Sequence, residues 1–187
     1  MSKRTKYVLH GGNAHHINPQ NDKFLKEVLA DTPNNTKILL VYFAKEDDRI
    51  PKNRDEDIAA FNRNKGDKNL TFETANDKDF TEQVKKADIV YLHGGNTLKL
   101  LNALKKFPKL KDLFEGKTIA GESAGAYVLS SWFYSKTANG VFEGLGSVAV
   151  KTICHYIGEN SNKLDNLPTK VESLFMEDYQ FKVFQQS

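Results

Sequence analysis

The chemically most informative segment of the sequence has the pattern G-x-S-x-G, formed by Gly121, Ser123 and Gly125. It lies between a predicted strand over residues 117–121 and a predicted helix over residues 124–133. A serine on a sharp strand-to-helix turn projects its hydroxyl outward, and the flanking glycines let backbone approach a substrate. The pattern therefore favours Ser123 as a nucleophile, although a serine in this place is also a common helix N-cap.

A serine hydroxyl needs a base before it can act as a nucleophile. Of the five histidines, His155 follows a predicted strand over residues 148–153 and could lie at a strand end beside Ser123. A lone histidine is more often a surface or hydrogen-bonded residue. Only one carboxylate, Glu143, lies between Ser123 and His155. The sequence therefore offers a single candidate for the acid in the chain order serine, acid, histidine of the α/β-hydrolases. The carboxylates after His155 are Glu159, Asp165, Glu172, Glu177 and Asp178.

A second glycine turn, Gly94-Gly95-Asn96-Thr97, follows the predicted strand over residues 89–92. Its N–H groups could supply an oxyanion donor, or the turn could simply open the next helix with Asn96 or Thr97 as N-cap; both can hold at once. The seven residues 7–13 resemble residues 90–96. Because ligands bind at the carboxyl ends of strands in an open parallel sheet, both glycine turns could border one site.

The remaining histidines and the single cysteine indicate no metal centre. His15 and His16 are adjacent and point apart on a regular strand or helix, and no H-E-x-x-H pattern or cysteine cluster accompanies them. His10 and His93 could instead line the pocket, where a protonated imidazole would favour an acidic substrate group. Cys154 should face away from its neighbour on a strand and is expected to be a buried, inert thiol.

Short apolar runs alternate with amphipathic ones over most of the chain. This alternation predicts an α/β fold with a mostly parallel sheet and helices on both faces. After residue 139 the pattern weakens, and we expect little regular structure beyond residue 153. The expected strands are 7–10, 38–44, 70–74 (nearer an edge), 89–92, 117–121 and 148–153, and the expected helices lie around 24–29, 54–65, 80–87, 98–104 and 124–133.

Length and composition fit one soluble domain over residues 1–187. The formal net charge is +3 and no block of basic residues stands out, so we expect neither nucleic acid nor a membrane as partner. The single cysteine suits a reducing cytoplasm. Neither a signal peptide nor a transmembrane run is visible, and we expect a cytoplasmic protein.

Four segments together resemble one known family, the aspartyl dipeptidase (peptidase E) and cyanophycinase family of serine peptidases. They are the G-G-N-T-x-x-L-L turn at 94–101, the G-x-S-A-G segment at 121–125, Ile153-Cys154-His155-Tyr156, and the tail at 174–178. The resemblance implies a three-layer α/β/α fold related to class I glutamine amidotransferases. It also implies Ser123 as nucleophile, His155 as base, and the N–H groups of Gly95 and Ala124 as the oxyanion hole.

The sequence departs from this family at the third catalytic position. Aspartyl dipeptidases carry an aspartate some fifteen residues beyond the serine, where this chain reads Lys136-Thr137-Ala138-Asn139-Gly140. Asn139 could still orient His155 through its side-chain carbonyl. Otherwise Glu177 or Glu143 must orient His155, or Ser123 and His155 act as a dyad without a third residue. The chain also stops soon after residue 184, so specificity for an N-terminal aspartate is not carried over.

The leading hypothesis is hydrolysis of small peptides, such as dipeptides, through an acyl-enzyme and without any cofactor. Candidate substrate-binding residues are Gly94, Asn96, His93 and His10, and a homodimer is a possible assembly. An esterase or amidase with the same site is the first alternative, because one nucleophile serves any acyl transfer. The second is a non-catalytic binding module, whose missing triad aspartate would mark a degenerate site.

Overall fold

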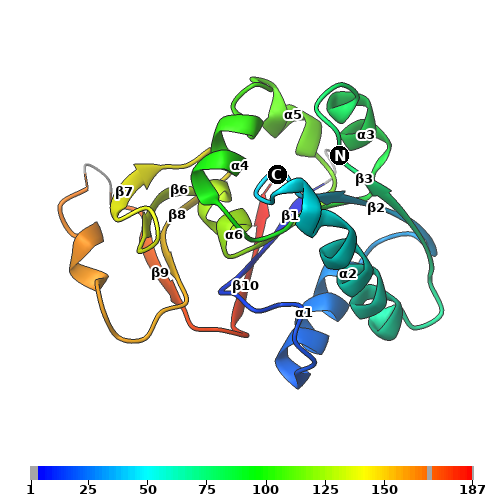
Figure 1. The fold of residues 1–187 in the computed structure, drawn as a ribbon, viewed down its shortest axis with the longest axis horizontal. Coiled ribbons are helices and arrows are strands. Elements are labelled where there is room, and N and C mark those ends of the chain that lie inside the picture. The colour runs from blue at the N-terminus through cyan, green and yellow to red at the C-terminus, as the bar shows by residue number, and fades with distance from the viewer. Residues whose placement is uncertain (1–3, 168–169, 187) are drawn as a thin grey trace.

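The computed structural model describes residues 4–167 and 170–186, and within them the strands form two sheets (Figure 1). The larger sheet has the order β10-β1-β5-β4-β2-β3 and the smaller one the order β7-β6-β8-β9. In chain order the elements are β1 (Thr5–His10), α1 (Pro19–Leu29), β2 (Asn35–Val41), η1 (Asp47–Arg49), α2 (Ile50–Asn64), β3 (Asn69–Thr74), α3 (Phe80–Lys86), β4 (Ile89–Leu92), α4 (Thr97–Leu104), α5 (Leu110–Phe114), β5 (Thr118–Glu122), α6 (Ala124–Leu129), β6 (Ser130–Ser135), β7 (Gly140–Glu143), β8 (Val148–Cys154), η2 (Ser161–Leu164), β9 (Glu172–Met176) and β10 (Phe181–Gln186).

The larger sheet is covered on both faces, as the continuous apolar strands predict. Along β2, Ile38 and Leu40 point into a core shared with α1 and α2, whereas Leu39 and Val41 point into a core shared with α3 to α6. Figure 1 shows α3, α4 and α5 on one side of this sheet and α1 and α2 on the other. The expected three-layer α/β/α arrangement with a mostly parallel sheet is therefore confirmed.

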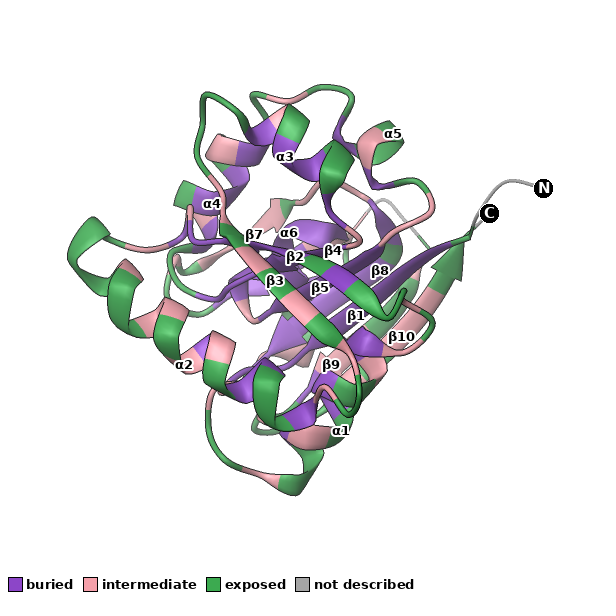
Figure 2. Cartoon of the chain, turned by 90° about the vertical axis from the view of Figure 1, so that its right-hand side faces the viewer, coloured by how far each residue is buried: buried purple, intermediate pink, exposed green. Residues whose placement is uncertain are grey.

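Burial follows each strand's position in the larger sheet. The central strands β1, β4 and β5 are buried throughout, whereas β3 alternates between exposed and partly buried residues (Figure 2). β3 pairs only with β2 and forms one edge, as its alternating sequence predicts. At the other edge β10 pairs antiparallel to β1, while β1, β5, β4, β2 and β3 are mutually parallel.

The smaller sheet shares a core with the larger one. Phe133 on β6, Val150 on β8 and Met176 on β9 belong to the same apolar cluster as Leu9 and Leu92 of the larger sheet. The chain passes from β9 in the smaller sheet to β10 in the larger one through residues 177–180. This short connection consequently lies where the two sheets meet.

Two expectations about the second half of the chain are wrong. The helix expected over residues 124–133 ends at Leu129, and β6 begins at Ser130. The sequence Ser130–Ser135 contains three aromatic residues that favour a strand, and β6 pairs with both β7 and β8. Regular structure also continues past residue 153, as β9 and β10. Both are short strands whose residues are mostly exposed or half-buried, and each mixes polar with apolar residues, so neither reads as the continuous apolar run of a central strand.

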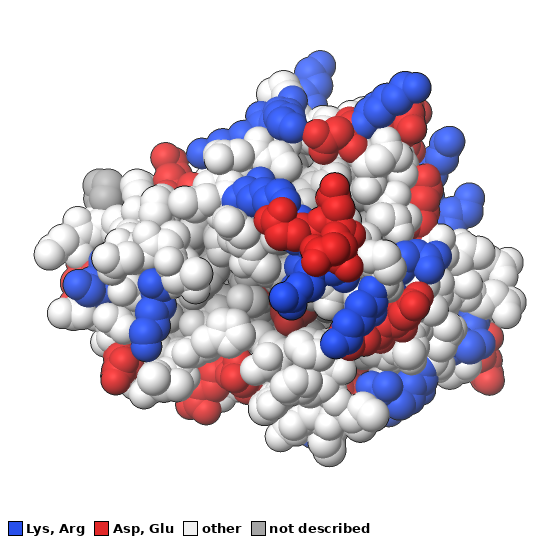
Figure 3. Space-filling model, viewed as in Figure 1, with Lys and Arg blue, Asp and Glu red and all other residues white. Residues whose placement is uncertain are grey.

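Surface charge is mixed in sign on the face shown in Figure 3, where basic and acidic side chains lie side by side. No helix among residues 4–167 and 170–186 is long and apolar enough to cross a membrane.

Candidate active site

Ser123 occupies the turn between β5 and α6 in a conformation that side chains rarely adopt. Its φ is 49° and its ψ is −101°, and its N–H donates to the carbonyl of His10 on the neighbouring strand at 2.9 Å. A non-glycine residue in this region is strained, and such strain persists only where the surroundings hold it in place. The turn presents the Ser123 hydroxyl at the carboxyl end of the larger sheet.

His155 reaches Ser123 from the smaller sheet. It directly follows β8, and its Nε2 lies 2.9 Å from the Ser123 Oγ. Its backbone is also left-handed, with φ of 51°, and its N–H donates to the carbonyl of Gly11 at 3.0 Å. The two sheets thus bring together a hydroxyl and an imidazole that are 32 residues apart in the chain.

Asp178 completes a chain of hydrogen bonds from the connection between β9 and β10. Its Oδ1 lies 2.6 Å from Nδ1 of His155. A carboxylate only accepts, so Nδ1 carries the proton and Nε2 is free to accept the proton of Ser123. This tautomer is the one in which an imidazole can act as a general base toward the serine.

The residues expected to orient His155 lie elsewhere. Asn139 is exposed in the turn between β6 and β7, and Glu143 pairs with Trp132 at the end of β7. Glu177 is exposed, and its N–H donates to the side chain of Gln180. The acid that contacts His155 lies in the same tail segment as Glu177, but it is Asp178, one position later.

The second glycine turn places a free N–H opposite the nucleophile. Gly95 has a φ of +148°, and a β-carbon there would lie 2.5 Å from the carbonyl oxygen of Ala44, so only glycine fits. Asn96 caps α4 by accepting from the N–H of Lys99 at 3.0 Å, which anchors the turn. Among the described residues, neither the N–H of Gly95 nor that of Ala124, the first residue of α6, has a hydrogen-bond acceptor.

Tyr127, one turn after Ser123 on α6, clamps the end of β8. Its hydroxyl accepts from the N–H of Cys154 at 3.0 Å and donates to the carbonyl of Cys154 at 3.2 Å. This pair of bonds joins the helix that follows the nucleophile to the residue that precedes His155. The Cys154 thiol is buried, as expected, and burial raises its pKa well above the ordinary value.

His10 and His93 do not line the substrate cavity, contrary to expectation. They are 0% and 2% exposed and lie beneath the site around the buried carboxylate of Glu122. Burial lowers the pKa of His10, which accepts from the N–H of Gly12 at Nδ1 and is therefore held neutral. Burial alone would raise the pKa of Glu122, but the charge of nearby imidazoles, His93 foremost, and the N–H of Ala14, which donates to Oε1 at 3.3 Å, together lower that pKa.

A cavity of about 590 Å³ opens beside Ser123 and His155. Its walls include Gly95 and Thr97, residues 135–137 and the segment after His155. Lys136 and Glu159 stand at its rim with their charges 4.0 Å apart, and both side chains are largely exposed. Of the expected substrate-binding residues, neither Gly94 nor Asn96 is on its wall, although the backbone of Gly94 packs beside Ser123.

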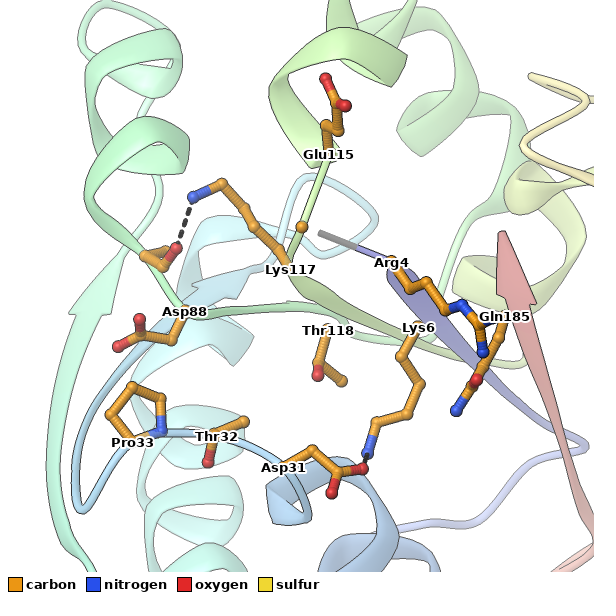
Figure 4. Close-up of a pocket in the computed structure, with 12 residues that line it drawn as sticks. Arg4, Lys6, Asp31, Thr32, Pro33, Asp88, Glu115, Lys117, Thr118 and Gln185 are labelled. Carbon is orange, nitrogen blue, oxygen red and sulfur yellow. Dashed lines mark hydrogen bonds and ion pairs between the residues drawn. The ribbon is translucent and has the colours of Figure 1, made fainter. Parts of the chain in front are cut away.

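A larger cavity, of about 760 Å³, lies at the opposite end of the sheet, where β1 and β5 begin (Figure 4). Both of its lysines already have partners in the structure. Lys6 donates to the carbonyls of Glu27 and Ala30 and stands 3.5 Å from Asp31, and Lys117 donates to the carbonyl of Ala87. Because the hydrogen-bonded pair of Ser123 and His155 lines the smaller cavity, we place the chemistry there.

Comparison with known proteins identifies the family of the chain. The sequence matches peptidase family S51 over residues 8–179. No curated protein sequence matches the chain. Among solved structures, a peptidase from an acI-B1 Actinobacterium superposes with a TM-score of 0.71 at 22% identity, covering 96% of this chain and 83% of that one. A "Putative Peptidase E Protein" from Listeria monocytogenes EGD-e gives a TM-score of 0.67 at 17% identity, covering 100% and 98%. At these identities the two likenesses show the fold.

Fold and site together define a serine hydrolase of the α/β class. The family match extends over most of the chain and narrows the class: the protein belongs to peptidase family S51 and is a serine peptidase.

Proposed function

We propose that this peptidase hydrolyses small peptides, dipeptides among them, through an acyl-enzyme on Ser123. The observation that carries the proposal is the unbroken chain of hydrogen bonds from the Ser123 hydroxyl through His155 to Asp178, at 2.9 and 2.6 Å. Each of the three residues has the partner that its role requires. A serine, a histidine and a carboxylate in this geometry recur on unrelated folds with the same division of labour.

In the first half of the reaction, His155 Nε2 takes the proton of Ser123 as its oxygen attacks the scissile carbonyl carbon. Asp178 keeps the imidazole in the reactive tautomer and stabilises the imidazolium that forms. The imidazolium then gives its proton to the leaving amine, and the C–N bond breaks. Water, deprotonated by the same nitrogen, attacks the acyl-enzyme, and Ser123 recovers its proton as the acid product leaves.

The oxyanion of each tetrahedral intermediate would be held by the N–H groups of Gly95 and Ala124. Both lie next to the nucleophile, and among the described residues both lack an acceptor. Removal of one such donor typically costs about 3–4 kcal/mol of transition-state stabilisation. The glycine turn supports this role, because the N–H of Asn96 donates to the carbonyl of Ala44 at 2.9 Å and holds the turn in place before substrate arrives.

The size and rim of the cavity support a short peptide as substrate. A volume of about 590 Å³ lies within the range of small-molecule pockets and leaves little room for a folded protein chain. Lys136 and Glu159 supply one charge of each sign at the rim, which suits a ligand whose two termini are oppositely charged. We further propose a cytoplasmic site of action, in keeping with the single cysteine.

Two alternatives are an esterase or amidase and a non-catalytic binding module. An esterase or amidase activity would use the same nucleophile, and a panel of peptides, esters and amides would separate it from peptide hydrolysis. The argument for a non-catalytic module was the absence of an acid beside the histidine. The contact of Asp178 with Nδ1 of His155 at 2.6 Å speaks against that module.

A fluorophosphonate probe tests the proposal directly, because it reacts only with an activated serine. We expect mass spectrometry to find the label on Ser123, and expect labelling to be abolished in Ser123→Ala and strongly slowed in His155→Ala. Dipeptide hydrolysis followed by amine release should show the same dependence. Peptide hydrolysis by Ser123→Ala at the same rate as by the folded wild-type protein would overturn the assignment.

A further inference from the structure

We propose that Asn13 is a positioning residue that holds the Asp178 carboxylate in the orientation His155 needs. The inference rests on the proposed function of Ser123, His155 and Asp178. It concerns the turn at residues 11–13, the first of the two similar glycine segments in the sequence, to which the proposed mechanism assigns no part.

The contact that carries the proposal is a hydrogen bond on the far side of the carboxylate. The Asn13 Nδ2 donates to Oδ2 of Asp178 at 2.8 Å, while Oδ1 of the same group lies 2.6 Å from His155 Nδ1. The two oxygens therefore have different partners. With both ends of the carboxylate held, its plane cannot rotate without breaking a bond.

Asn13 is itself held from beneath by buried side chains. Its φ of 60° is left-handed, a conformation that asparagine tolerates better than most residues. Asn21, which is 0% exposed, donates from Nδ2 to the Asn13 carbonyl at 2.8 Å and accepts at Oδ1 from His10 Nε2 at 2.9 Å. The His10 ring in turn accepts from the N–H of Gly12 at 3.1 Å. These bonds fix the backbone from which the Asn13 amide projects.

The same turn also contacts the backbone of His155 and that of Tyr179, the residue after Asp178. The Gly11 carbonyl accepts from the N–H of His155 at 3.0 Å, and the Gly12 carbonyl accepts from the N–H of Tyr179 at 3.1 Å. One short segment thus contacts the base and the acid, which belong to different strand ends. It connects them across the junction of the two sheets.

The need for such support follows from the exposure of Asp178. Its side chain is 38% exposed and stands on a short connection, so water could compete for its oxygens. An amide donor binds the carboxylate without adding charge, and it does not compete for the imidazole proton. The two similar glycine segments then serve opposite sides of one site: Asn96 anchors the turn that carries Gly95, and Asn13 anchors the acid.

Asn13→Gly is the most direct test, because glycine adopts the left-handed backbone and removes only the amide. We expect the second-order rate of fluorophosphonate labelling of Ser123, and kcat for dipeptides, to fall at least about tenfold with KM within about twofold. Asn139→Gly is the matched control, because Asn139 is also left-handed, with φ of 47°, but lies in an exposed turn away from Asp178. It should label at the wild-type rate.

Asn13→Asp supplies a readout that a merely structural role would not move. The substitution keeps the shape of the side chain and sets a second carboxylate against Asp178, so the added negative charge should favour protonated His155. We expect the acid limb of the labelling rate against pH to move to higher pH, whereas Asn139→Asp should leave it in place.

An Asn13→Gly protein that is folded and labels within twofold of wild type, with an unmoved pH profile in Asn13→Asp, would overturn the proposal. Failure of the underlying function would look different, because Ser123 would then not be labelled in the wild type at all. A loss of labelling in proportion to the loss of folded protein, measured by thermal unfolding of the same samples, would also count against a positioning role.

Discussion

The imidazole of His155 lies directly against the backbone of Gly12, so closely that a β-carbon at residue 12 would overlap the ring at Cε1 and crowd Nδ1 and Nε2. Gly12 also has a φ of +142°, a conformation that side chains rarely adopt. The ring is therefore confined between this glycine, the Ser123 hydroxyl and the Asp178 carboxylate. Such confinement replaces the burial that positions many catalytic histidines, since the His155 side chain is 47% exposed.

Gly12→Ala should disable the site while leaving most of the fold intact. The new methyl group displaces the His155 ring, and a shift of about 1 Å can cost about 10²-fold in rate. We expect fluorophosphonate labelling of Ser123 to slow by about that factor. Gly66→Ala is the matched control, because Gly66 also has a positive φ, of 57°, but nothing lies within 4 Å of the added carbon. Wild-type labelling by Gly12→Ala would show that the ring can move aside without loss.

Asp178→Asn should reduce kcat by about 10³-fold with a small effect on KM. The amide can donate to Nδ1, and this favours the tautomer that carries its proton on Nε2. In that tautomer Nε2 cannot accept the proton of Ser123. Steady-state hydrolysis of a dipeptide measures the effect. Glu177→Gln and Asn139→Ala serve as controls, because neither side chain reaches His155, and we expect both to stay within about twofold of wild type.

If Glu177→Gln were the damaging change and Asp178→Asn were harmless, the connection between β9 and β10 would have to be repositioned by one residue in solution. Circular dichroism on all three variants guards against unfolding as the cause.

The part of the site built from local sequence could be predicted, because its geometry is encoded in neighbouring residues. Gly121, Ser123 and Gly125 imply a strand-to-helix turn wherever they occur in this context, and the continuous apolar strands imply a sheet covered on both faces. His155 could be placed because a predicted strand ends just before it. These inferences need only periodicity and turn chemistry.

The rest depends on contacts between distant segments. Asp178 and Glu177 are adjacent carboxylates, and only the path of the chain from the smaller sheet into the larger one decides which faces His155. His10 ends β1 and His93 directly follows β4, yet both rings are buried away from the cavity. The Nε2 of His10 bonds Asn21 at 2.9 Å, and that of His93 stands 3.6 Å from Asp57. The end of α6 at Leu129 is likewise set by tertiary pairing of β6 with β7 and β8.

Tyr127→Phe tests whether the clamp on β8 matters for the base. Without the hydroxyl, the N–H and carbonyl of Cys154 lose their partner, and a buried backbone group left unsatisfied costs about 1–3 kcal/mol. We expect the free energy of unfolding in urea to fall by about that amount. We also expect labelling of Ser123 to slow several-fold, because His155 follows Cys154 directly. A variant as stable as wild type would mean that water replaces the hydroxyl at no cost.

Asp57 should make stability depend on pH in a direction opposite to that of most carboxylates. Its side chain is 4% exposed, accepts from the Tyr42 hydroxyl at 2.7 Å and stands 3.6 Å from His93 Nε2. Burial raises the pKa of Asp57 to about 7, with His93 and the Tyr42 hydrogen bond partly opposing the rise. An aspartate in an unfolded chain has a pKa of about 3.9.

Between these two values the folded protein holds a proton that the unfolded chain has released, so the contribution of Asp57 to stability falls as pH rises from about 4 to 7. Asp57→Asn removes this titration and keeps an oxygen that can accept from Tyr42. We therefore expect the Tm of Asp57→Asn to rise relative to wild type by about 6–12 °C between pH 4.5 and 7.5, the shift that about 3 kcal/mol gives in a chain of this size. Differential scanning calorimetry across that range measures the difference. A constant difference would mean that Asp57 keeps the same charge in the folded and unfolded states throughout.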